Sequence, residues 1–214
     1  MQELEKILNT NEKVLWKGKP IFWPFILSNA AVSIFGMIWL GMFFPFIIVA
    51  MMAGAKASPI IGLNPGVVIF LMPHFWIGII MTFGPVVYNL LVYKHVLYAI
   101  TDRRVILQTG VIGRDFQMVD FDKITNAEVN VGLLDTILMG GKTGSIKISS
   151  AGTFINTKNG VSSKPYTLAN VESPYEVFKL LKGVSMDVKT DIEYPNKLRP
   201  SENPGYTTEY TPKK

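Results

Sequence analysis

The sequence predicts a membrane α-helical hairpin joined to an all-β domain that a C-terminal helix caps. Between Lys19 and Lys94 the only lysine, arginine, aspartate or glutamate is Lys56, whereas about a quarter of the residues of a soluble domain are charged. After Lys94 apolar and polar residues alternate, which is the period of a β-strand. Residues 173–182 carry the signals that begin and end a helix.

The charge-poor region is long enough for two membrane spans. Because about 20 apolar residues cross the hydrocarbon core, we expect helices over about residues 22–51 and 67–93. Residues 53–65 are rich in glycine and proline and form the predicted turn between the helices. A re-entrant pass around Pro45 is the alternative. A signal peptide is excluded, because its apolar region would be only about 7–15 residues long.

Basic residues flank the two spans on the same side. The loop between the spans carries Lys56 alone, whereas the flanks carry Lys6, Lys13, Lys17, Lys19, Lys94, Arg103 and Arg104. Cytoplasmic flanks of membrane spans are enriched in lysine and arginine. The sequence therefore predicts a multi-pass cell-membrane protein with both termini in the cytoplasm.

Short alternating segments after Lys94 predict about seven antiparallel strands, separated by turn residues. The strands are expected near residues 96–100, 105–109, 116–121, 126–131, 144–149, 153–157 and 164–168. Leu133, Leu134, Ile137 and Leu138 indicate one short helical turn between the fourth and fifth strands.

The helix that closes the domain is predicted over Ser173–Lys182. Ser173 fits the N-cap, Pro174 the first helical position, and Glu176 completes a capping box. Gly183 is the expected stop.

These elements divide the chain into four predicted segments. Residues 1–19 form a cytoplasmic segment, 20–93 the hairpin and 94–183 a domain expected to fold by itself. Residues 184–214 contain four prolines and one glycine, balanced charge and no periodicity, which predicts a disordered tail.

Several motifs resemble one family in their order. The run from Tyr98 to Gly110, YAITDRRVILQTG, is similar to the opening of bacterial and archaeal pleckstrin-homology-like (PH-like) membrane proteins, and so is the stretch Glu12–Pro20 before the hairpin. Ile124…Val129, Leu133-Leu134, Gly144–Ile148 and Ser173–Phe178 follow in the family's order. The resemblance spans about Glu12 to Lys182. It implies a PH-like barrel capped by one helix and attached to a membrane, and it implies no activity.

Charge patterning and motif spacing exclude two kinds of ligand. The net charge of +5 is spread along the chain without a block of like charges, so a nucleic-acid partner is not expected. The run Gly140–Thr143 mimics the end of a phosphate-binding loop. It lacks that motif's first glycine and precedes a predicted strand, whereas the motif precedes a helix. No nucleotide is therefore expected.

Catalysis and metal binding find no support in the sequence. The chain has no cysteine and two histidines, and no nucleophile–base pair is visible. Asp115, Asp120 and Asp122 match no calcium-loop spacing. We expect no catalytic residue, no metal and no cofactor.

Four basic residues are candidates for contact with lipid headgroups: Arg103, Arg104, Lys142 and Lys147. Arg103 and Arg104 follow a membrane helix closely, and a hairpin turn with a topology-setting charge pair is the favoured alternative for them. Lys142 and Lys147 form either part of a basic rim near anionic lipid or scattered solvated lysines.

The sequence leaves three functional hypotheses. The first is a non-catalytic, membrane-anchored PH-like interaction module that binds a protein partner or assembles with itself. The second is a sensor of anionic lipid headgroups. The third, a small transporter or a membrane-enzyme subunit, needs a polar intramembrane site that the sequence does not provide.

Overall fold

The computed structural model describes residues 2–52, 70–150, 154–157, 160–163 and 165–193, which fall into two compact units. One unit joins Met1–Phe25 to the chain from Lys94 onward, and the other is Ile26–Tyr93. The N-terminal segment is thus part of the β-rich unit, although the sequence suggested a separate segment. The predicted turn at 53–65 and the tail beyond residue 193 lie outside the described residues.

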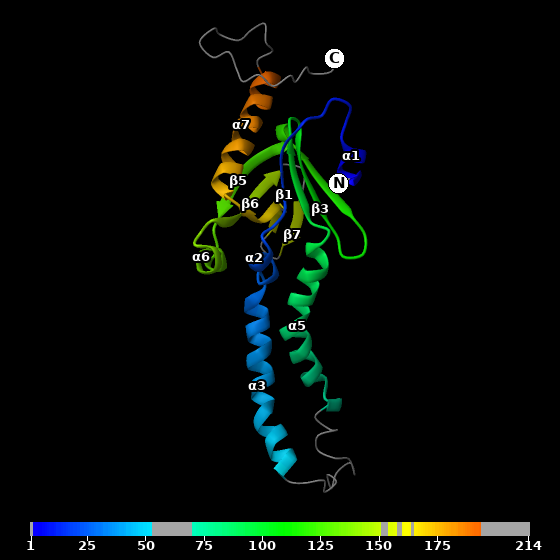
Figure 1. Cartoon of the computed structure of the whole chain (residues 1–214), viewed down its shortest axis with the longest axis vertical. Helices are drawn as coiled ribbons and strands as arrows, with labels where there is room; N and C mark the ends of the chain where they lie inside the picture. The colour runs from blue at the N-terminus through cyan, green and yellow to red at the C-terminus, as the bar shows by residue number, and fades with distance from the viewer. Residues whose placement is uncertain (1, 53–69, 151–153, 158–159, 164, 194–214) are drawn as a thin grey trace. The chain divides into compact units, whose positions relative to one another are not determined.

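The apolar unit is a pair of helices, α3 (Ala30–Met52) and α5 (Pro73–Tyr93), which lie side by side (Figure 1). The short helix α2 (Phe22–Ile26) precedes them. In the part of the chain that the structure describes, α5 has the length and the mean hydropathy, 1.8, of a membrane span, and Ala30–Phe46 is a shorter apolar stretch. Helix α3 continues through Pro45, so a re-entrant turn at that proline is wrong.

Two glycines allow α3 and α5 to approach closely. A Cβ atom on Gly36 would lie 2.5 Å from the Thr82 nitrogen, and one on Gly78 would lie 2.6 Å from a Leu40 methyl group. Asn89 of α5 donates from Nδ2 to the Ile26 carbonyl, at 3.0 Å. Polar groups therefore lie between the helices, while many large apolar side chains of both helices are exposed.

The other unit contains two main antiparallel sheets. The first has the order β1-β2-β3-β4, and the second the order β5-β6-β9, with β7 and β8 forming a separate hairpin. The strands are β1 (Val14–Gly18), β2 (Leu97–Thr101), β3 (Arg104–Thr109), β4 (Asp115–Asp120), β5 (Ile124–Asn130), β6 (Thr143–Ser150), β7 (Phe154–Thr157), β8 (Gly160–Ser163) and β9 (Tyr166–Glu172).

The main core lies where the inner faces of the two sheets meet. Tyr98 and Ile100 of β2 share a face with Val105 and Leu107 of β3, which lie opposite them. The hydroxyl of Tyr98 accepts a hydrogen bond from the Ala169 N–H of β9, at 3.1 Å. Burial raises the pKa of Tyr98 to about 12, although this hydrogen bond opposes the shift.

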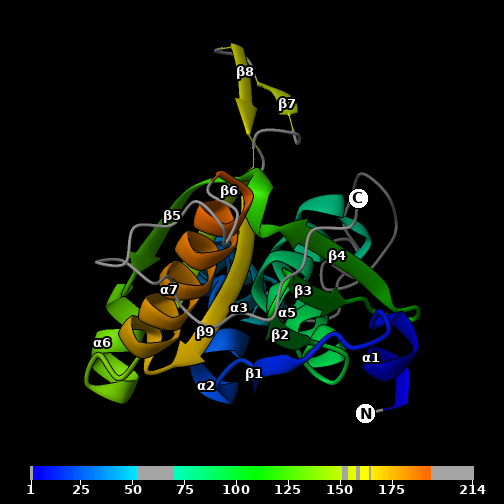
Figure 2. The same cartoon turned by 90° about the horizontal axis from the view of Figure 1, so that it is seen from above.

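One helix packs on the outer face of the first sheet, and another lies along the second sheet. Helix α1 (Gln2–Ile7) packs Leu4 against Ala99 and Ile106 on the outer face of the first sheet. Helix α7 (Pro174–Glu193) lies along the second sheet (Figure 2). The 3-10 turn η1 (Phe121–Lys123) joins β4 of the first sheet to β5 of the second. Within the second sheet, α6 (Leu133–Met139) joins β5 to β6.

The fold departs from the predicted barrel in one respect. It has antiparallel strands and a C-terminal helix, as expected, but the strands form two sheets and no closed barrel. The described strands also include β1 and β8, which the sequence analysis did not predict. Strand β1 was missed because its partner β2 lies about eighty residues away along the chain.

The predicted end of the C-terminal helix is wrong. Helix α7 starts at Pro174, as expected, but passes through Gly183 and ends at Glu193. Val177, Leu181, Val184 and Val188 are all buried and recur at helical spacing. Burying the last two valines outweighs the roughly 1 kcal/mol that an internal glycine costs. Residues 184–193 are therefore helical, not a tail.

Candidate functional site

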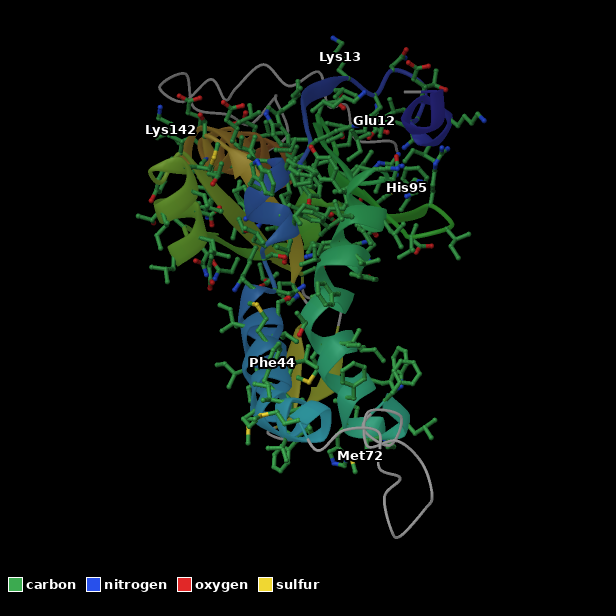
Figure 3. All side chains as sticks on the ribbon, turned by 60° about the horizontal axis from the view of Figure 1, so that its bottom comes forward. Glu12, Lys13, Phe44, Met72, His95 and Lys142 are labelled. Carbon is green, nitrogen blue, oxygen red and sulfur yellow. The ribbon has the colours of Figure 1, made fainter. Side chains whose placement is uncertain are left out.

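The four basic residues that the sequence singled out lie apart. Arg103 is in the β2–β3 turn and Arg104 begins β3, whereas Lys142 follows α6 and Lys147 lies in β6, opposite Glu128. Figure 3 shows Lys142 on the side of this unit away from α1. The fold therefore does not assemble these four residues into one site.

Arg104 is committed to an internal ion pair. Its Nη2 lies 2.7 Å from Glu12 Oε2 and its Nε lies 3.0 Å from Oε1. The Glu12 side chain is fully buried. Burial by itself raises the pKa of Glu12. Hydrogen bonds from Arg104 and from the Asn9 N–H lower it by more than burial raises it, so the pKa lies below its ordinary value. Arg104 thus fastens the N-terminal segment to the start of β3.

A second group of basic residues gathers at the opposite end of the first sheet. Strand β1 ends, β2 begins and β4 begins at this end, because the strands are antiparallel. The β2–β3 turn with Arg103 lies one strand length away, roughly 16 Å for five residues at about 3.3 Å each. The chain continues from the end of β1 toward the apolar helices, and it returns from α5 to the start of β2. Both connections are therefore at this same end of the first sheet.

These residues line a pocket of about 250 Å³, which we call the basic pocket. Lys17 is on β1, on the face that packs against α1, because its partner Ala99 contacts Leu4. No aspartate or glutamate is among the described residues that line the pocket. Its basic and titratable lining consists of Lys17, Lys19, Lys94, His95 and Arg114.

The remaining lining is suited to an anion with an apolar portion. Leu4 and Leu97 provide an apolar floor, and Gln108 adds an amide. The Nδ1 atom of His95 is buried and has no hydrogen-bond partner among the described groups. Figure 3 shows His95 on the same side of the unit as α1. Cations in a concave site reinforce one another's potential, so the basic pocket attracts anions.

A larger neighbouring pocket of about 390 Å³ has a different electrostatic character. Lys17 and Lys19 line it too, but Glu172 and Glu176 line its other side. The opposite charges compensate, so this pocket has less attraction for an anion. The smaller basic pocket is therefore the stronger candidate site.

Sequence reasoning found three of the basic pocket's residues without finding the pocket. The sequence indicated Lys17, Lys19 and Lys94 only as charges that set membrane topology. Arg114 was not singled out, and His95 entered only as one of the chain's two histidines. The pairing of Gly18 with Tyr98 brings the first three together, and no local pattern in the sequence indicates that pairing.

The match to a known family agrees with this architecture. The family model described as "Bacterial PH domain" matches residues 35–184, from within α3 to α7. This chain belongs to the bacterial PH domain family. The resemblance noted in the sequence is thereby confirmed. No curated protein and no solved structure matches the chain.

Membership in the bacterial PH domain family sets a broad class of function. A PH-like domain is an interaction or lipid-binding module, and PH domains are generally non-catalytic. Among the described residues, no group of three or more histidines, aspartates or glutamates is placed to hold a metal ion. The choice of ligand has to come from the site, because a fold hosts many ligands.

Proposed function

We propose that this bacterial PH domain protein is anchored in the cell membrane by its two apolar helices and binds anionic phospholipid headgroups through the basic pocket. The single observation that carries the proposal is the set of lysines, arginine and histidine around that pocket, at the end of the sheet where both connections to the apolar helices leave. This is the second of the sequence-based hypotheses.

The side-chain distribution of the apolar unit supports the anchoring. Thr82 and Asn89 are buried between the helices, whereas Ile38, Met42 and Ile80 are more than half exposed. Exposed apolar side chains around a polar interior are unfavourable in water and favourable in hydrocarbon. Lys19 and Lys94 flank this unit, as basic residues flank membrane spans on the cytoplasmic side.

The place of two pocket lysines in the chain, next to the proposed anchor, supports a lipid ligand. Lys94 immediately follows α5, and Lys19 lies three residues before α2. A lysine held close to an anionic lipid surface contributes about 1 kcal/mol to binding. An anchored chain therefore presents these lysines to headgroups at a high local concentration.

Removing two of the pocket's lysines is expected to weaken headgroup binding about thirtyfold, since the two contribute about 2 kcal/mol together. The double variant Lys17→Gln, Lys94→Gln tests this in the detergent-solubilised full chain. Short-chain phosphatidylglycerol would be titrated by calorimetry, with short-chain phosphatidylcholine and inorganic phosphate as separate arms. Binding should also weaken as salt is raised.

The matched control is Lys179→Gln, Lys182→Gln, which removes the same charge from exposed positions on α7. It should leave the affinity within about threefold. An equal loss of affinity in both double variants would mean that net charge alone causes the effect, and it would contradict binding at the basic pocket. If free phosphate bound as tightly as phosphatidylglycerol, the ligand of the pocket would be a soluble anion and the lipid proposal would be contradicted.

The proposed anchoring predicts a specific topology. Reporter fusions placed after Asn64 and after Lys182 should report opposite sides of the membrane, with Lys182 in the cytoplasm. The physical reason is that each apolar helix crosses once and the basic flanks stay inside. If both reporters were labelled equally, the hairpin would be disproved.

A further inference from the structure

Helix α6 carries an apolar surface that faces outward. Leu133 is 76% exposed, Ile137 67% and Leu138 41%. The only charged residue of α6, Asp135, is buried and turned inward. The outward side of this helix therefore has no charge and costs free energy when water covers it.

The buried Asp135 holds α6 rigidly on the domain. Its Oδ1 accepts hydrogen bonds from the Thr143 hydroxyl at 2.7 Å and from the Asn170 amide at 3.1 Å. Its Oδ2 accepts one from the Gly132 N–H at 3.0 Å. Such a network fixes the direction in which Leu133 and Ile137 point.

The same network extends from α6 to Ile21, the residue before α2. Asn170 lies in a β-bulge of β9, where Ser145 of β6 has two residues opposite it, and it adopts a positive φ of 49°. Its carbonyl accepts a hydrogen bond from the Ile21 N–H at 2.7 Å. Asn170 is thus bonded both to α6 and to the residue that precedes α2.

Exposed aromatic residues follow directly at that point. Trp23 is 60% exposed, and its ring packs edge-on against Phe22, with centroids 5.2 Å apart. Tryptophan is enriched at membrane interfaces, because one end of its ring is apolar and the other polar. The hydrogen bonds of Asn170 therefore connect α6 to a segment with the character of a membrane interface.

We propose that α6 lies in the interface of the lipid bilayer, with Leu133, Ile137 and Leu138 immersed among the acyl chains. This inference rests on the proposed anchoring, because it uses the point where the chain enters the membrane. The occupant of the α6 surface is lipid, because the chain beyond Ile21 continues into the apolar helices. Lys142, exposed just after α6, is placed to reach a headgroup. Lys142, one of the two lysines that the sequence suggested for lipid contact, thus acts beside α6 and outside the basic pocket.

Site-directed spin labelling tests this inference in the full chain. The protein has no cysteine, so single variants Ile137→Cys and Met186→Cys take a nitroxide at one site each. Met186 on α7 is the matched control, because it is a large apolar residue with 62% exposure on the same unit. The labelled chains would be reconstituted into mixed phosphatidylcholine and phosphatidylglycerol vesicles.

Collision of each nitroxide with oxygen and with a water-soluble nickel chelate measures its immersion. The ratio of nickel to oxygen accessibility should be about tenfold lower at residue 137 than at residue 186, because charged chelates are excluded from the acyl boundary. Equal ratios at both sites would overturn the inference. Nitroxide–nitroxide broadening at residue 137 would mean that a second copy covers α6, and would overturn it as well.

The two proposals fail separately. A water-exposed label at residue 137, in a chain whose fusions at Asn64 and Lys182 report opposite sides, sinks this inference and leaves the anchoring intact. Fusions that report the same side sink the anchoring itself.

Discussion

The Glu12→Ala variant is expected to lose about 4 kcal/mol of stability in the β-rich unit, because it leaves the largely buried Arg104 guanidinium without its partner. Arg104 also donates to the Ile7 carbonyl at 3.0 Å, so the N-terminal segment should loosen together with the β2–β3 turn. Amide hydrogen exchange of the detergent-solubilised full chain would measure this as faster exchange in β1, β2 and β3.

The matched control is Glu5→Ala, at an exposed position of α1, which should change stability by less than about 0.5 kcal/mol. Acidity supplies a second readout. Because the pKa of Glu12 is lowered in the fold from its ordinary value of 4.5, the ion pair contributes fully above that pH and is lost as the pH falls below it. The Glu12→Ala variant should lose less stability than the wild type on acidification. Slow exchange in β1 in this variant would contradict the assigned role of the pair.

The Asp135→Ala variant is expected to cost a similar amount, about 4 kcal/mol, because it removes three hydrogen bonds and leaves buried donors unpaired. Thr143 and Asn170 are both buried, so water cannot readily replace the missing carboxyl group. Exchange should accelerate in α6 and at the β6–β9 bulge. It should also accelerate at the Ile21 amide, which is bonded to Asn170.

Asp122→Ala is the control for this variant, because Asp122 is an exposed aspartate of the same unit. It should behave like the wild type within about 0.5 kcal/mol. If Asp135→Ala accelerated exchange in α6 alone, the connection from α6 through Asn170 to Ile21 would be weaker than its hydrogen bonds indicate.

Local patterns in the sequence predicted most of the elements of the β-rich unit. Alternation predicted β2 to β6, and the pair Leu133-Leu134 with Ile137-Leu138 predicted α6, because these signals lie within a few residues of each other. The start of α7 followed from Ser173-Pro174. Its end did not, because Gly183 is a local stop signal and the burial of Val184 and Val188 against the sheet overrides it.

The candidate site depended on pairings between distant residues. Lys17 and Lys19 approach Lys94 only when β1 pairs with β2, and Arg114 joins them through the β3–β4 hairpin. The same pairing brings Glu12 to Arg104. Arg104, which the sequence suggested for headgroup contact, therefore forms an internal ion pair. A single sequence contains no sign of such a pairing, because β1 is a short segment with no partner nearby.

The sequence by itself determined that this chain has a charge-poor apolar part and a strand-rich part with a final helix, and that its motifs follow a bacterial PH domain. These properties follow from composition and short-range periodicity, which can be recognised from residues that are neighbours in the sequence. Only the tertiary structure decided that the strands form two sheets and that the N-terminal segment completes the first of them. It also decided which lysines converge on one pocket and which way α6 faces. Those outcomes depend on long-range backbone hydrogen bonds and on buried polar groups such as Asp135 and Asn170, whose partners become neighbours only when the chain has folded.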